Sequence, residues 1–157
     1  MSKAYVPSAF RTYCKNPVCY IQKTPKNIEN MAYALMRYLV DQNLFEDSRI
    51  YFKKGEVWYA LQPDTTLNSQ NFEKITHSHG KKTYELHMSK DIDPNDYFEY
   101  NGNYLSMSFE GPLYHVLNGT EWLHEHEYVT ENLRNFFSTY GLHYELGNAW
   151  NFSLYEI

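Results

Sequence analysis

Seven histidines raise the question of a metal centre, because imidazole is a frequent ligand of transition metals. His77-x-His79 falls in a β-prone run, where both rings would project from one face, but the hairpin register that we expect places His87 well away from His79. His124-x-His126 falls in or beside a helical run, where residues two apart point about 200° apart and cannot share an ion. The spacing therefore predicts no metal centre.

Acid–base and nucleophilic chemistry have no local motif in this chain. The sequence contains no Gly-x-Ser-x-Gly elbow, phosphate-binding glycine loop or dinucleotide fingerprint, so no cofactor is expected. Cys14 and Cys19 have no second ligand pair for zinc and are expected to be structurally passive thiols. His143-x-Glu145 would share one face of a strand as orienting group and base. An enzyme with a site built from distant His and Glu residues is thus an alternative, although a non-enzymatic protein is favoured.

Charge is distributed unevenly along the chain. Residues 1–90 carry thirteen basic and eight acidic side chains, whereas residues 91–157 carry eleven acidic side chains and one basic one, Arg134. The net charge of −5 therefore combines two opposed halves. Such asymmetry is evidence about partners rather than about the fold.

The acidic half interleaves its carboxylates with aromatic residues. Carboxylates spaced along an aromatic surface can imitate a phosphate track and steer a protein towards a basic partner. The residues that we expect to bind such a partner are Asp91, Asp93, Asp96, Tyr97, Glu99, Tyr100, Glu121, Glu125 and Glu127. The plainer alternative is a solvated face that the basic half of the same molecule partly neutralises.

These features favour a small non-enzymatic inhibitor that docks an acidic, aromatic face on a basic, nucleic-acid-binding protein. The Asn- and Tyr-rich make-up would suit an accessory protein of a phage or mobile element, such as an anti-CRISPR or anti-restriction protein. A nucleic-acid-binding module that uses the hairpin Lys74–Lys90 is the alternative. Neither an apolar run of about 18 residues nor a signal-peptide core occurs, so a cytoplasmic protein without membrane contact is expected. Homo-oligomerisation is left open.

The elements that must position these residues follow from local patterns. Residues 1–24 contain prolines and no clear period, and are expected to form an irregular arm or an edge strand. Apolar residues at helical spacing predict a helix from Pro25 to Asn43 and a second long helix that ends before Gly141. Leu113 to Leu117 should form a short helical turn.

The strands are predicted from β-prone runs that turn residues separate. Hairpins are expected over residues 49–61, 72–88 and 142–155, with His87 opposite Lys74 in the second. Tyr104 to Phe109 alternates as a half-buried strand does. The sequence therefore predicts one α+β domain over residues 1–157, with an antiparallel sheet of about five to seven strands and two amphipathic helices packed on one face.

Overall fold

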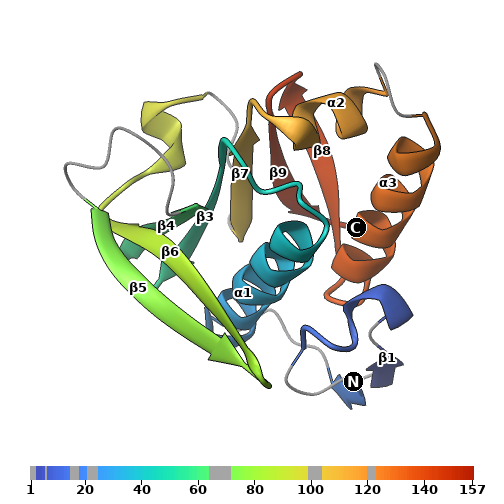
Figure 1. Ribbon diagram of the computed structural model, residues 1–157, viewed down its shortest axis with the longest axis horizontal. Coiled ribbons are helices and arrows are strands. Elements are labelled where there is room, and N and C mark those ends of the chain that lie inside the picture. The colour runs from blue at the N-terminus through green and yellow to red at the C-terminus, as the bar shows by residue number, and fades with distance from the viewer. Residues whose placement is uncertain are drawn as a thin grey trace.

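The computed structural model describes residues 3–5, 7–14, 18–20, 25–63, 72–98, 104–119 and 123–157 (Figure 1). Its centre is a seven-stranded antiparallel sheet in the order β5–β6–β4–β3–β7–β9–β8. The strands are β3 (Ser48–Lys54), β4 (Val57–Pro63), β5 (Phe72–His79), β6 (Lys82–Lys90), β7 (Leu105–Phe109), β8 (Leu142–Asn148) and β9 (Asn151–Glu156). The predicted α+β fold with an antiparallel sheet is confirmed.

The three α-helices of the described chain are α1 (Pro25–Asp41), α2 (Pro112–Asn118) and α3 (Leu123–Ser138). Apolar residues at the predicted spacing are buried in α1 and α3, and both helices lie on the same face of the sheet (Figure 1). Helix α1 ends two residues before the expected Asn43, because Asn43 takes a left-handed conformation with a φ of 58°. No helix in these described ranges is both long and apolar enough to cross a membrane.

Side-chain alternation gives the sheet two different faces. In β3, Ile50 and Phe52 belong to the core under the helices, whereas Arg49 and Tyr51 point to the opposite side. Strand β7 repeats the pattern, with a polar Ser108 next to a core Phe109. The face opposite α1 and α3 is called the outer face below, and it is far more polar than the face that the helices cover.

The described residues of the segment expected to be an irregular arm or an edge strand contain two short strands and a 3₁₀ helix. Strands β1 (Lys3–Tyr5) and β2 (Val18–Tyr20) form a two-stranded antiparallel sheet of their own. Between them the 3₁₀ helix η1 (Ser8–Phe10) inserts the fully buried Phe10 into the main core. Its ring stacks on Phe136 of α3, with centroids 3.9 Å apart. This segment is therefore part of the packed domain.

The hairpins follow the predicted pairing but extend further. Lys74 lies opposite His87 in the β5–β6 ladder, as predicted. The turn between β3 and β4 contains Gly55, and the turn between β5 and β6 contains Gly80. Their φ angles of 65° and 63° lie in the left-handed region, which glycine adopts without strain. The expected helical turn from Leu113 lies within α2.

Candidate functional site

Polar side chains form a row across the whole outer face. Cross-strand pairing and one side-chain hydrogen bond place one polar residue of each strand beside the next. From β5 to β8 these residues are Lys74, His87, Gln62, Arg49, Ser108, Asn151 and Asn148. Antiparallel sheets commonly turn a polar face to solvent, but Gln62 and Asn151 of this row are at most 1% exposed.

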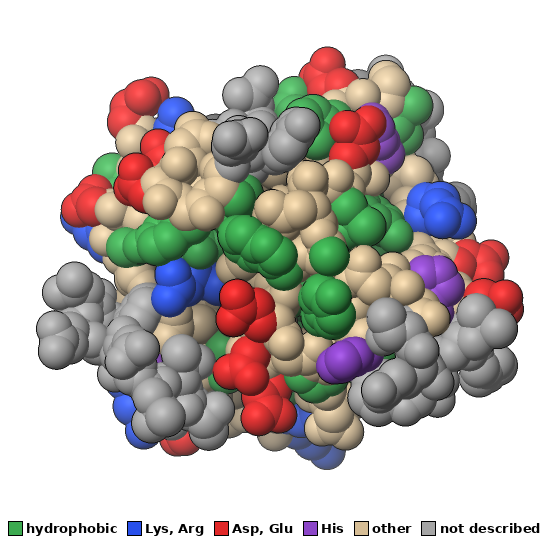
Figure 2. Space-filling view, turned by 90° about the horizontal axis from the view of Figure 1, so that it is seen from above, with side chains coloured by type: hydrophobic (Ala, Val, Ile, Leu, Met, Phe, Trp, Pro, Cys, Tyr) green, Lys and Arg blue, Asp and Glu red, His purple; other side chains and the backbone are tan. Residues whose placement is uncertain are grey.

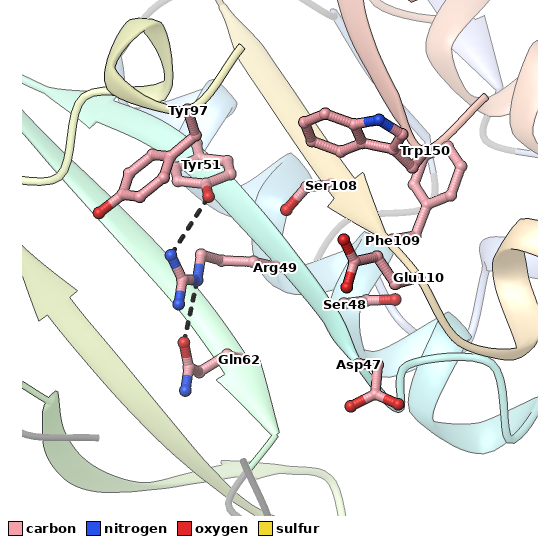
Figure 3. A pocket seen from close by; sticks show the side chains of 10 residues that line it. All are labelled: Asp47, Ser48, Arg49, Tyr51, Gln62, Tyr97, Ser108, Phe109, Glu110 and Trp150. Carbon is pink, nitrogen blue, oxygen red and sulfur yellow. Dashed lines mark hydrogen bonds between the residues drawn. The ribbon is translucent and has the colours of Figure 1, made fainter. Parts of the chain in front are cut away.

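A cavity of about 360 Å³ opens where β4, β3 and β7 present this row. It lies between Tyr97 on one side and Trp150 on the other (Figure 3). Ligand pockets usually span roughly 300–1,000 Å³, so this volume suits a small ligand or one long side chain. The lining residues are Asp47, Ser48, Arg49, Tyr51, Gln62, Tyr97, Ser108, Phe109, Glu110 and Trp150.

Arg49 lies at the centre of the cavity floor. Its Nε donates a hydrogen bond of 3.0 Å to Oε1 of Gln62, and its Nη1 donates one of 3.3 Å to the hydroxyl of Tyr51. The guanidinium carbon is 5.6 Å from the ring centroid of Tyr97, within cation–π range. These contacts hold the guanidinium on the side of the cavity that faces Gln62 and Tyr97 (Figure 3).

Two exposed carboxylates, of Asp47 and Glu110, lie on the other side of the cavity (Figure 3). The backbone N–H of Glu110 donates to the carbonyl of Asp47 at 3.0 Å, which keeps the two residues together. A Cβ atom at Gly111 would lie 2.4 Å from the carbonyl oxygen of Glu46, so only glycine permits this close approach.

Strand β3 begins and β7 ends at the upper edge of the sheet in Figure 1. Figure 2 looks onto that end of the molecule, and shows acidic side chains in a short row beside a cationic side chain and a band of hydrophobic ones. The cavity therefore has cationic and anionic sides with aromatic walls between them.

Buried polar atoms without a hydrogen-bond partner are concentrated on the outer face. They include Nε2 of Gln62, Oδ1 of Asn151 and Oγ of Ser89, and these three residues are at most 1% exposed. Leaving a buried polar group without a partner costs roughly 1–3 kcal/mol. The Gln62 amide is notable because the residue also lines the cavity.

The segment 91–98 brings four of the predicted binding residues to the outer face. Its last residue, Phe98, is buried and meets the Trp150 ring edge to face at 5.8 Å. Within the segment, the Asp93 carboxylate accepts a hydrogen bond from the backbone of Asn95 and so caps the 3₁₀ helix η2 (Pro94–Asp96). Tyr97 remains half exposed and forms one wall of the cavity. Asp91 and Asp96 are exposed beside it.

The other predicted binding residues do not share this position. Glu127 is exposed on α3, which packs against α2 and β8 on the helical side of the sheet. Glu99, Tyr100 and Glu121 lie outside the described residues, as does the side chain of Glu125. The predicted binding residues that the structure describes therefore lie on both sides of the sheet, with residues 91–97 on the outer side and Glu127 on the helical side.

Several polar side chains of the basic hairpin β5–β6 bond to helix α1 of the same chain. Nη1 of Arg37 in α1 donates to Nε2 of His77 at 2.7 Å, and Nε of Arg37 donates to the carbonyl of Tyr13 at 3.0 Å. Asp41 at the end of α1 pairs with Lys82 and accepts a hydrogen bond from Tyr84 at 3.1 Å. This contact between α1, residues 7–14 and the hairpin is called the α1 seam below.

Burial dominates the titration behaviour of the α1 seam. Burial, and then the charges of Arg37 and His79, lower the pKa of His77, while burial lowers the pKa of Arg37. Burial and the nearby carboxylate of Asp41 raise the pKa of Tyr13 and of Tyr84 to about 12. These groups hold three segments together, and their arrangement is that of a structural contact.

The remaining histidines do not converge on a reactive centre in the described chain. His143 and Glu145 lie 3.9 Å apart on β8, as the alternation predicts, and both are partly exposed. His126 on α3 bonds to the carbonyl of Val116, on the other side of the sheet. Within the described ranges, no three His, Cys, Asp or Glu residues are placed to hold a metal ion.

The cavity itself escaped sequence reasoning apart from Tyr97. Arg49, Gln62, Glu110 and Trp150 come from four separate places in the chain, and only the strand order brings them together. The available signal was the alternation of polar residues in β3 and β7, which marks a polar second face without showing what meets there. No known protein family, no curated protein and no solved structure matches this chain.

Proposed function

We propose that this chain is a small binding protein without enzymatic activity, which docks the acidic, aromatic surface around the cavity on a basic, nucleic-acid-binding protein. The observation that carries the proposal is a group of carboxylates around one exposed aromatic. None of them forms an ion pair with a described cationic side chain. They belong to Asp47, Asp91, Asp93, Asp96 and Glu110, with Tyr97 among them.

The basic half of the chain leaves these charges available. The two lysine–carboxylate pairs among the described residues are Lys54 with Glu29 and Lys82 with Asp41. All four residues precede Lys90, so these lysines neutralise acids of their own half. The carboxylates of Asp91, Asp93, Asp96 and Glu110 thus remain available to attract a partner, which supports docking over neutralisation within the chain.

The surface also has the make-up of a protein interface. Tyr97 is 50% exposed and Trp150 lies across the cavity from it. Tyrosine and tryptophan are enriched among the hot spots of interfaces, whereas charges at the rim mainly raise the association rate and select the partner. Covering the basic surface of a nucleic-acid enzyme would inhibit it, as an anti-CRISPR or anti-restriction protein of a phage or mobile element does.

A charge-neutralised variant tests the proposal without disturbing the backbone. Asp91 has a φ of 62° and Asp93 is a helix cap, and asparagine suits both positions. The triple variant Asp91→Asn, Asp93→Asn, Asp96→Asn therefore removes three charges from an intact segment. The matched control is Glu56→Gln, Glu73→Gln, Glu85→Gln, at three exposed positions away from the cavity.

Both variants and the wild type are compared by affinity capture from lysate at low salt and at about 0.5 M salt, where interactions between exposed charges are largely screened. We expect the wild type and the control to capture the same nucleic-acid-binding protein at low salt. The triple asparagine variant should capture about tenfold less of it, or still less. The purified partner should then lose nucleic-acid binding when the wild-type chain is added. Equal capture by the two variants would contradict docking through residues 91–96.

A second triple variant decides which acidic group docks. Glu121→Gln, Glu125→Gln, Glu127→Gln neutralises the predicted binding residues that follow residue 120, of which Glu127 is exposed on α3. Loss of the partner with this variant alone would move the docking surface to the helical side of the sheet, and would contradict the surface proposed here.

A further inference from the structure

The cavity carries one negative charge more than it can balance. Asp47 and Glu110 share the cavity lining with one cationic side chain, that of Arg49. The bonds of Arg49 to Gln62 and Tyr51 direct its guanidinium away from both carboxylates (Figure 3). One positive charge placed between Asp47 and Glu110 would complete the charge balance of the cavity.

The walls of the cavity suit a planar cation. Trp150 lies beside Glu110, and its edge-to-face contact with Phe98 at 5.8 Å fixes the indole ring. A guanidinium can stack on an indole face and at the same time bind a carboxylate with two parallel N–H bonds, whereas an ammonium is a point charge without a plane. The carboxylates and the indole together therefore favour arginine over lysine.

The buried amide of Gln62 calls for a hydrogen-bond acceptor on the ligand, in addition to its positive charge. Its Nε2 is a donor without a hydrogen-bond partner, and the residue is 1% exposed. A metal ion or a polyamine offers no acceptor for this donor, but a peptide carbonyl does. The unpartnered donor therefore points to an arginine that arrives as part of a polypeptide.

We propose that the cavity binds one arginine side chain of the partner protein, with its guanidinium between Asp47 and Glu110 and against Trp150, and with a main-chain carbonyl near Gln62. This inference rests on the proposed docking function and names its anchor. A long basic side chain inserted into a pocket at the centre of an interface is a common hot spot.

Capped tripeptides test the pocket without the partner. The probes are acetyl-Gly-Xaa-Gly-amides in which Xaa is arginine, lysine or citrulline, titrated into the isotope-labelled full chain and followed through the indole N–H signal of Trp150. Citrulline keeps the shape of arginine without its charge. We expect the arginine peptide to bind at least about tenfold more tightly than the citrulline peptide, and more tightly than the lysine peptide.

Conservative variants then assign the binding to the two carboxylates. Glu110→Gln and Asp47→Asn should each lower the affinity for the arginine peptide by about tenfold. Asparagine tolerates the φ of 55° at residue 47. Glu46→Gln is the control, because Glu46 is exposed next to Asp47 but does not line the cavity. Equal binding of the arginine and citrulline peptides, or equal effects of the Glu46 and Glu110 variants, would overturn the inference.

The two proposals fail in different ways. If a captured partner is lost with the 91–96 asparagine variant but is unaffected by Glu110→Gln and Asp47→Asn, the docking surface stands and arginine insertion is wrong. If the arginine peptide binds with the expected selectivity but no partner depends on residues 91–96, the pocket stands and the docking proposal is wrong.

Discussion

At the scale of single residues, two buried serines of the outer face differ in whether their hydroxyl has a partner. Ser89 and Ser106 are both fully buried. The hydroxyl of Ser106 lies 2.8 Å from that of Ser153, whereas Oγ of Ser89 has no hydrogen-bond partner. A buried hydroxyl without a partner loses its bonds to water on folding and gains nothing in return.

We therefore predict opposite effects of alanine at these two sites. Ser89→Ala should raise the free energy of unfolding by about 1 kcal/mol, and Ser106→Ala should lower it by about 1 kcal/mol, because it leaves Ser153 without this bond. Urea denaturation of both variants measures the difference. A loss of stability in Ser89→Ala as large as in Ser106→Ala would show that the Ser89 hydroxyl is bonded in solution.

The histidine of the α1 seam gives a prediction about acid. Because Arg37 can only donate, Nε2 of His77 must accept and the ring must be neutral. Its pKa is lowered in the folded protein, so the unfolded chain, with a histidine pKa near 6.5, takes up the proton first. The contribution of His77 is therefore complete above about pH 6.5 and is lost as the pH falls towards its lower folded pKa.

The variant His77→Gln checks this prediction because it keeps a neutral acceptor and removes the titration. Stability should be measured from pH 7.5 down to about pH 5, above the range in which most carboxylates protonate. We expect the wild type to lose stability over this range and the variant to lose less. Parallel pH profiles for the two proteins would rule out His77 as the titrating group.

At the scale of elements, Phe10 is the fully buried side chain by which the 3₁₀ helix η1 enters the core. Phe10 of η1 is fully buried and stacks between Phe136 of α3 and Tyr38 of α1, at 3.9 and 4.3 Å. Phe10→Ala should lower the free energy of unfolding by about 3–5 kcal/mol, the usual cost of such a cavity. The exposed neighbour variant Ser8→Ala is the control and should be nearly neutral.

Chemical denaturation with an unchanged slope would attribute the Phe10→Ala loss to the folded core. Equal midpoints for Phe10→Ala and Ser8→Ala would mean that η1 contributes nothing to the stability of the domain.

The same element shows what the sequence could and could not predict. Helix α1 and the hairpins have long periodic patterns, so their type and the pairing of Lys74 with His87 were predictable. Phe10 stands alone in a segment without a period, and its burial depends on two helices distant in sequence. The cavity is similar, since Arg49 and Glu110 meet only because β7 pairs with β3. Patterns within a segment define its faces, whereas the neighbours of a face depend on strand order.

At the scale of the whole molecule, the α1 seam and the cavity lie on opposite faces of the sheet. Arg37, Asp41 and their tyrosine partners close the helical side, whereas Asp47 and Glu110 surround the cavity on the outer side. A pH change that weakens the α1 seam therefore acts on stability through groups that take no part in the proposed docking surface.

The alkaline limit of the fold should be set at the α1 seam. Burial raises the pKa of Tyr13, Tyr33 and Tyr84 to about 12, with further contributions from Asp41 or Glu29. A raised folded pKa gives stability that is complete below the unfolded value near 10 and is lost as the pH rises from there towards 12. Tyr33 belongs to α1 and stacks on His77, while Tyr13 and Tyr84 bond to Arg37 and Asp41 of the same helix. Their ionisation should therefore open the same contact that His77 protonation weakens.

Spectrophotometric titration of tyrosine absorbance checks this prediction. After rapid pH jumps the folded protein should ionise in two steps, with a group of tyrosines delayed to near pH 12, whereas the chain in concentrated urea should ionise in one step near pH 10. The delayed step should coincide with the loss of the folded circular-dichroism signal. Tyr84→Phe should make that step smaller. If the folded protein ionised in a single step near pH 10, the tyrosines of the α1 seam would be open to solvent, and the seam would not limit the alkaline stability of the fold.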